Sequence, residues 1–214
     1  MKRFFADVYR CSGEAKKRGR AHTYLLQRDE GNLLLCHQTP PSTEDISEIE
    51  RLGGVGSQWV CHHHDLLGDG VHEDLYERFG YMLYHHRADA KGVRKHTGCP
   101  AVQFGDDGLE HGSNFSALFF PCCTDGLTVY RWHNRGKHYL ISSHAISMRE
   151  GEWHVHFPYP SRRQDLLRPQ MAKLAKLRLD YVLPGYNTAD EAEYYRLDDG
   201  MKKSLSLTLK AKAV

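Results

Sequence analysis

Three consecutive histidines followed by an aspartate, His62-His63-His64-Asp65, are the side chains of this sequence best suited to metal chemistry. Imidazole nitrogens bind borderline metal ions such as zinc. In an extended backbone His62 and His64 would point to the same side, because they are two residues apart, and both could bind one ion. The alternative is a surface loop that happens to be rich in histidine.

The family resemblance described below implies two later side chains that could complete a site of this kind. Cys123 offers a thiolate and His144 offers another imidazole. With two histidines of the loop they would form a set of three nitrogens and one sulfur, which suits zinc. A cysteine that only fills the core, and a neutral histidine that hydrogen-bonds to the backbone, are the alternatives. The predicted metal ligands are His62, His64, Cys123 and His144.

The number of ligands decides what such a metal ion could do. If all four side chains bind, the tetrahedron is full and the metal is structural, because catalysis needs an open position for water. If only three bind, the metal could activate a water molecule. The same resemblance then makes Asp65 and Tyr186 the candidate catalytic residues beside the ligands.

The composition is that of an ordinary globular protein of 214 residues, with 40% hydrophobic and 26% charged residues. The formal net charge of +2 is too close to neutrality to indicate a nucleic acid or an anionic membrane as partner. No apolar stretch reaches the roughly 18 residues of a membrane-spanning helix, and the first residues hold no signal-peptide core. We therefore expect a cytoplasmic protein whose six cysteines are reduced thiols.

Strands and helices that alternate along the chain must position these residues. Helical spacing of apolar residues predicts helices over Glu44–Leu52, Glu73–Phe79 and Arg168–Leu179. Strict alternation predicts an edge strand at Ser204–Leu209, which could pair with a second copy of the chain. The pattern as a whole favours one mixed α/β domain over residues 1–214. Further strands are predicted at Phe4–Cys11, His22–Arg28, Asn32–His37, Ser57–Cys61, Tyr81–His85, Gln103–Phe104, Leu118–Pro121, Leu127–His133, Lys137–Ser142 and Tyr181–Leu183.

Four segments, in order, resemble the motifs of the metallo-β-lactamase-like superfamily. The family's first motif reads Thr-His-x-His-x-Asp-His, and Cys61–Leu67 stands in its place. Pro121–Thr124 takes the place of Pro-Gly-His-Thr, and Leu140–His144 that of a strand ending in Thr-Gly-Asp. Leu183–Tyr186 takes the place of Leu-Pro-Gly-His. The resemblance covers about residues 4–190 and leaves residues 191–214 as a C-terminal extension.

This resemblance implies a four-layer αββα sandwich, in which two mixed β-sheets lie face to face with helices outside. It places seven hydrophobic residues on core strands. They are Val60, Leu83, Leu118, Phe119, Leu140, Val182 and Leu183.

The departures from the family motifs bear on the metal site. A complete site of this family holds two metal ions through five histidines and two aspartates. Leu66 and Leu67 stand where an aspartate and a histidine would hold the second ion, although a one-residue gap would let Asp65 take the aspartate's role. His144 replaces the bridging aspartate, and Tyr186 replaces the last histidine. The ordinary dinuclear site therefore cannot assemble from these residues.

Two functions remain open on the sequence alone. The first is a diverged member of the superfamily that has lost the dinuclear site and its hydrolase activity, with no metal or one divalent ion, zinc being the best match. Such a protein would keep the pocket for a small-molecule ligand or the fold for assembly as a homo-oligomer. The alternative is a mononuclear metal-dependent hydrolase of an ester, thioester or phosphoester, with His62, His64 and either Cys123 or His144 as ligands.

Overall fold

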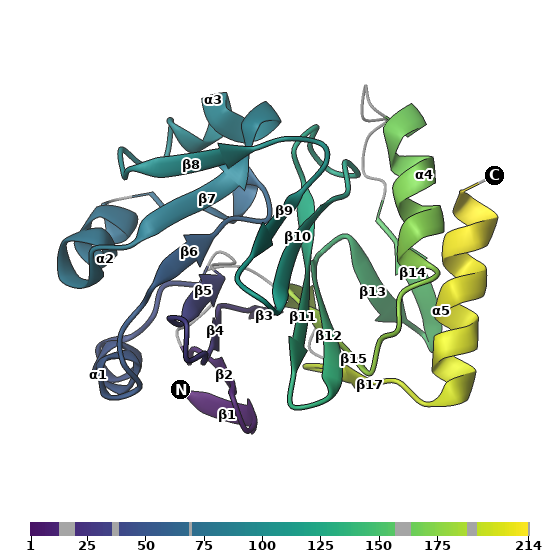
Figure 1. Ribbon diagram of the computed structural model, residues 1–214, viewed down its shortest axis with the longest axis horizontal. Coiled ribbons are helices and arrows are strands. Elements are labelled where there is room, and N and C mark those ends of the chain that lie inside the picture. The colour runs from purple at the N-terminus through teal and green to yellow at the C-terminus, as the bar shows by residue number, and fades with distance from the viewer. Residues whose placement is uncertain (13–19, 36–38, 69, 157–163, 188–191, 214) are drawn as a thin grey trace. The chain divides into compact units, whose positions relative to one another are not determined.

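The computed structural model describes residues 1–12, 20–35, 39–68, 70–156, 164–187 and 192–213, and it divides into two compact units, Met1–Phe104 and Gly105–Val214 (Figure 1). Each unit consists of a mixed β-sheet with its own helices. The predicted pair of mixed sheets with helices is therefore confirmed. Among the described residues, no helix combines the length and the apolar character required to cross a membrane.

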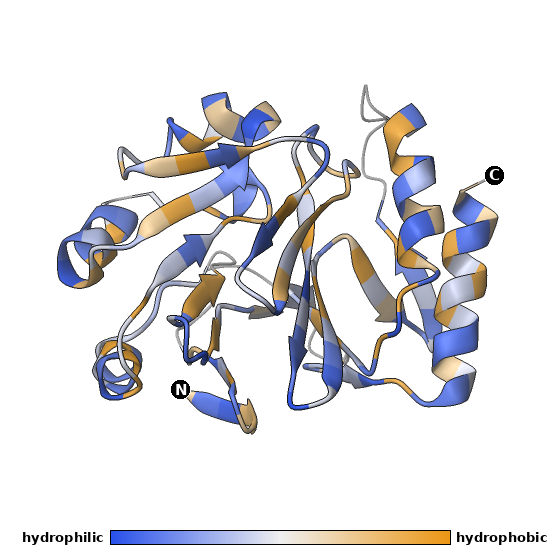
Figure 2. Ribbon diagram, in the orientation of Figure 1, coloured by the Kyte–Doolittle hydropathy of each residue, from blue (hydrophilic) through white to orange (hydrophobic). Residues whose placement is uncertain are grey.

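The first unit has a seven-stranded sheet in the order β1-β2-β4-β5-β6-β7-β8. Its strands from β1 to β5 pair antiparallel and those from β5 to β8 pair parallel. The strands predicted within residues 22–28 and 32–37 are confirmed as β4 and β5, which pair as a hairpin and which Figure 2 shows to be hydrophobic. The bounds are β1 Lys2–Phe5, β2 Val8–Arg10, β3 Arg20–Ala21, β4 Tyr24–Leu26, β5 Leu33–Leu35, β6 Ser57–Trp59, β7 Met82–His86 and β8 Ala101–Phe104.

Two helices of the first unit cover one face of this sheet and confirm the sequence prediction. Helix α1 (Thr43–Arg51) begins at a capping box, in which Ser42 and Asp45 exchange side-chain and backbone hydrogen bonds. Helix α2 (Val71–Phe79) ends at Gly80, whose φ of 68° is left-handed. Shorter turns of helix follow the sheet's parallel strands: η1 His63–Asp65, η2 Arg87–Asp89 and α3 Ala90–Val93.

The second unit has a six-stranded sheet in the order β17-β15-β12-β11-β10-β9, with a separate hairpin β13–β14. All neighbours pair antiparallel except β12 and β15, which pair parallel. The turn between β11 and β12 has positive φ at Arg135 and Gly136, as a two-residue hairpin requires. The bounds are β9 Leu109–His111, β10 Phe115–Phe119, β11 Thr128–Asn134, β12 Lys137–Ser143, β13 Ile146–Arg149, β14 Glu152–Val155, β15 Tyr181–Pro184, β16 Tyr186–Asn187 and β17 Tyr195–Arg196.

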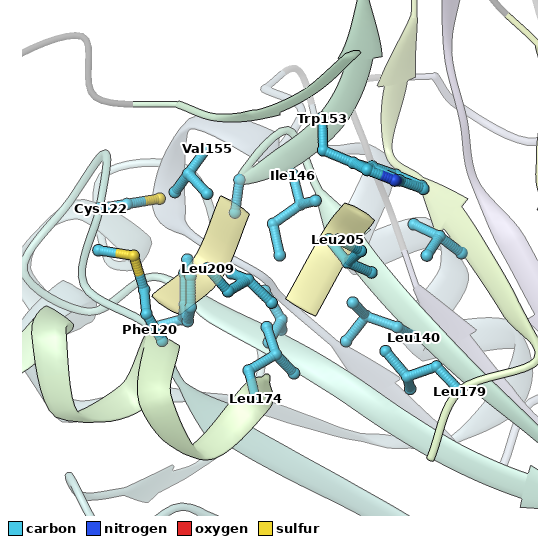
Figure 3. Packing of buried hydrophobic residues seen from close by; sticks show 14 of the residues in the cluster. Phe120, Cys122, Leu140, Ile146, Trp153, Val155, Leu174, Leu179, Leu205 and Leu209 are labelled. Carbon is cyan, nitrogen blue, oxygen red and sulfur yellow. The ribbon is translucent and has the colours of Figure 1, made fainter. Parts of the chain in front are cut away.

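Helices α4 (Gln164–Leu174) and α5 (Asp199–Lys212) pack on the second sheet and enclose its core. Figure 3 shows this core, with Leu205 and Leu209 of α5 beside Leu140 of β12. Of the seven predicted core residues, six are buried, although Val60 lies one residue beyond β6. Leu118 is only half-buried and packs at the edge of the cluster.

Three of the predicted elements need correction. The strand predicted over Phe4–Cys11 is a hairpin, because a turn at residues 6–7 separates β1 from β2. The predicted edge strand Ser204–Leu209 is wrong, because these residues belong to α5. The Asp198 side chain caps that helix, and Leu205 and Leu209 share its buried face since they are four residues apart. The helix predicted over Arg168–Leu179 begins earlier, at Gln164, and ends at Leu174.

Candidate metal centre

The histidine loop of the first unit follows β6, where the chain leaves the sheet. His62 has an extended backbone, but His63–Asp65 form one turn of 3-10 helix. The extended backbone predicted for this segment is therefore wrong. The rings of His62 and His64 nevertheless lie close, with 5.1 Å between their centroids.

His62 forms an ion pair or hydrogen bond with Asp65 inside the same loop. Its Nε2 lies 3.1 Å from Asp65 Oδ1, and both side chains are buried. A carboxylate at this distance accepts a hydrogen bond from Nε2–H, so that Nδ1 is the nitrogen left to bind a metal ion. Metal-binding histidines are commonly oriented by a carboxylate in this way. Asp65 is therefore placed to orient His62.

The middle histidine of the loop is anchored on the short helix α3. The backbone N–H of His63 donates to Asp89 Oδ2 at 3.1 Å, and its Nδ1 lies 3.2 Å from Asp89 Oδ1. A Cβ atom added to Gly92 would come within 2.3 Å of His63 Cγ and 2.7 Å of His63 Cβ. Glycine is thus required at position 92, because only a residue without a side chain leaves room for this imidazole.

A second anchor holds the end of the loop on α2. The N–H of Leu67 donates to His72 Nε2 at 3.0 Å, and Gln58 lies 2.9 Å from His72 Nδ1. Burial lowers the pKa of His72 from 6.5 to about 4, so the imidazole is neutral and can accept this hydrogen bond. Sequence reasoning missed both anchors, Asp89 and His72.

His64 is the exposed member of the triplet. Its pKa is lowered, first by partial desolvation and then by the neighbouring His62 and His63. A neutral imidazole is the form that binds a metal ion or accepts a proton. Leu66 is buried against Val60 and Leu83, so it belongs to the core of the first unit.

In the second unit Cys122 and Cys123 follow β10 and differ in their surroundings. Cys122 is fully buried in the core that Figure 3 shows, and burial strongly raises the pKa of its thiol. Cys123 is only half-buried. Of the two adjacent thiols, Cys123 is therefore the one that a metal ion could reach.

His144 lies in the turn between β12 and β13. The preceding residue, Ser143, has a φ of 52°, and its carbonyl accepts the N–H of Gly185. The His144 ring is half-buried and meets the His156 ring edge to face, with 5.2 Å between their centroids. Tyr186 lies on β16 and is 37% exposed.

Comparison with solved structures identifies the fold. A subclass B3 metallo-β-lactamase with an active-site glutamic acid superposes with a TM-score of 0.62 at 16% identity, over 99% of this chain and 87% of that one. The MIM-2 metallo-β-lactamase gives 0.61 at 18% identity, over 96% and 88%. BJP-1, a subclass B3 enzyme of Bradyrhizobium japonicum, gives 0.59 at 16% identity, over 98% and 90%. No protein-family model and no curated protein matches the sequence. The chain thus has a metallo-β-lactamase-like fold, as the sequence motifs predict.

Proposed function

We propose that this chain, whose fold is that of the metallo-β-lactamases, holds one divalent metal ion through His62, Cys123 and His144. The observation that carries the proposal is the chemistry of the donor set, two imidazoles and one thiol in segments that resemble the metal-binding motifs of the family. Two imidazoles and one thiolate favour zinc among the common divalent ions. His64 is the candidate for the fourth position.

Several features of the individual residues support this assignment. The contact with Asp65 fixes the tautomer of His62, and the anchoring of His63 on Asp89 and Gly92 fixes the loop. Cys122 is buried in the core, so Cys123 is the thiol that is accessible to a metal ion. Superposition on solved metallo-β-lactamases extends over nearly the whole chain, so both ligand-bearing segments lie within the shared fold.

We further propose that the dinuclear site of the family, and with it the family's hydrolase activity, has been lost. Leu66 and Leu67 have no lone pairs to offer, and Leu66 is committed to the core. His144 brings no negative charge to bridge two cations, and the phenol of Tyr186 is a poor replacement for an imidazole ligand of zinc. On this proposal the protein keeps one metal ion and a pocket for a small-molecule ligand.

The second candidate function is a mononuclear hydrolase of an ester, thioester or phosphoester. Three protein ligands leave one position of a zinc tetrahedron open, which is the arrangement of catalytic sites. His64 favours this candidate, because it is exposed and its lowered pKa keeps it neutral and able to accept a proton.

Elemental analysis of tag-free protein tests both candidates. We expect about one equivalent of zinc, lost in His62→Ala and in Cys123→Ser and kept in the surface control His154→Ala. Less than about a tenth of an equivalent in the unaltered protein would contradict metal binding. Hydrolysis of an ester, thioester or phosphoester by the unaltered protein, abolished by a chelator and by His62→Ala, would favour the second candidate over the first.

A further inference from the structure

A pair of histidines on the β11–β12 hairpin forms another group of metal-binding side chains, and it lies entirely within the second unit. His133 of β11 stands directly opposite His138 of β12 in the antiparallel register. The two imidazole rings are stacked, with 4.4 Å between their centroids and 16° between their planes. The two side chains therefore project from the same face of the sheet at the same level.

The hydrogen bonds of the sheet place this pair where side chains come closest. The N–H of His133 donates to the carbonyl of Asn114 at 2.8 Å, and the N–H of His138 donates to Asp180 Oδ2 at 3.0 Å. Both amides thus point away from each other, as in a non-hydrogen-bonded pair. Such pairs have Cα atoms about 4.5 Å apart, against about 5.5 Å for hydrogen-bonded pairs. Rotation of the side chains alone can then turn one nitrogen of each ring toward a common ion.

The hairpin holds the two imidazoles in a fixed and accessible place. The tight turn at Arg135 and Gly136 sets the register, and the opposite face is anchored by the buried rings of Trp132 and Tyr139. His133 is exposed and His138 is half-buried. An ion from solvent can therefore reach the pair, and little ordering is needed to bind it.

The charges around the pair decide which ions it can take. Burial, and next the neighbouring His133, lower the pKa of His138, so the imidazole is in the neutral form that binds metals. The carboxylate of Asp180 lies among several positively charged side chains. These side chains repel a metal ion that would be held by charge alone. Coordination bonds must supply the affinity, which excludes Mg²⁺ and Ca²⁺ and selects ions that prefer imidazole. The surrounding cations are Arg131, Lys137, Arg178 and Lys202.

We propose that His133 and His138 chelate one late first-row transition ion, Cu²⁺, Ni²⁺ or Zn²⁺, near the tip of the β11–β12 hairpin. The site is independent of the one proposed at His62, Cys123 and His144. Its remaining coordination positions face solvent, so they are open to water or to an external donor.

Titration calorimetry with Ni²⁺ on the tag-free full-length protein, first stripped with a chelator, tests this site. Ni²⁺ is the probe because, unlike Cu²⁺, it does not oxidise thiols. We expect His133→Ala and His138→Ala each to remove the same binding event, or to weaken it by at least about tenfold, because each ring supplies half of a chelate. His154→Ala is the matched control, since His154 is an exposed strand histidine that faces Ser147 instead of a second imidazole, and it should leave the event unchanged.

The outcomes separate a chelate from scattered surface binding and from the other metal site. Equal titrations of the unaltered protein and both hairpin variants would overturn the proposal, as would an effect of only one of the two histidines. Cys123→Ser should keep the hairpin event whether or not the histidine loop binds metal. Failure of the site proposed at His62 and failure of this one are therefore distinguishable.

Discussion

The two segments that carry the proposed ligands are held in place by opposite kinds of interaction. In the first unit the histidine loop is fixed by polar contacts, from Asp89 to His63 and from His72 to Leu67. In the second unit the segment after β10 is fixed by apolar burial, with Cys122 sunk in the same core as Phe120 and Val155 (Figure 3). The stability of the first segment should therefore depend on the protonation of its histidines and on single added atoms. The stability of the second segment should depend on the polarity of the side chains in its core.

Acid should loosen the first segment, and the expected effect is large. The pKa of His72 falls from 6.5 to about 4 on folding, so the unfolded chain takes up this proton first as the pH is lowered. Stability should then fall between pH 6.5 and pH 4, by about 3 kcal/mol from this one group.

Urea unfolding at a series of pH values measures this effect. Other groups, such as His85 and Asp45, also titrate, so the informative quantity is the difference between the unaltered protein and His72→Gln. Glutamine can still accept the N–H of Leu67 but has no proton to gain. Parallel stability curves for the two proteins would contradict the assignment.

Gly92→Ala should disturb the same segment by steric conflict. The added Cβ would overlap the root of the His63 side chain, which cannot move without displacing the loop. We expect a loss of about 2 kcal/mol of stability, as for overpacked interiors, and weaker zinc binding.

A second substitution in the same protein decides the cause of that loss. His63→Gly removes both the imidazole and the Cβ atom that Gly92→Ala would overlap, so the stability loss of the double variant should be smaller than the sum of the two single losses. Urea unfolding of the four proteins gives the coupling energy. Additive losses would show that His63 and Gly92 do not interact as described.

Cys122→Ser should test the apolar character of the second segment. The hydroxyl would enter a fully buried position in the core, so we expect a loss of about 1–2 kcal/mol. Cys123→Ser, at the half-buried neighbour, should leave stability nearly unchanged and instead remove the proposed metal ligand. Equal stability losses in the two variants, measured by urea unfolding, would remove the distinction between the two thiols.

The same contrast explains what the sequence could and could not predict. Most strands of the two large sheets and the helices α1 and α2 follow from apolar spacing and local capping, which a sequence displays directly, whereas β9, β13 and β14 were not predicted. The anchors of the histidine loop do not. Asp89 and His72 lie 26 and 5 residues from their partners, His63 and Leu67, and only the packing of η2 and α2 brings them together. Gly92 is the residue whose type indicates a close contact at this place, because glycine is otherwise unfavourable within a helix.

The misassigned C-terminal segment shows how one pattern serves two structures. Leu205, Leu207 and Leu209 alternate as in a strand, but Leu205 and Leu209 are also four residues apart, as on one face of a helix. The helix is favoured by the Asp198 cap at its N-terminus and by the burial of Leu205 and Leu209 in the core between α4 and α5. Leu207 is then left 56% exposed.

Leu207→Ala should therefore have the smallest effect of the set. The side chain buries little surface on α5, and alanine favours a helix, so we expect a change of less than about 0.5 kcal/mol. Leu209→Ala is the matched control on the same helix, because Leu209 is fully buried among the residues that enclose the second core, and its loss should cost about 2–5 kcal/mol. In a half-buried strand the two leucines would face the same side and their substitutions would cost similar amounts. Urea unfolding that gives equal losses would therefore contradict the helix and, with it, the apolar packing that holds the second unit.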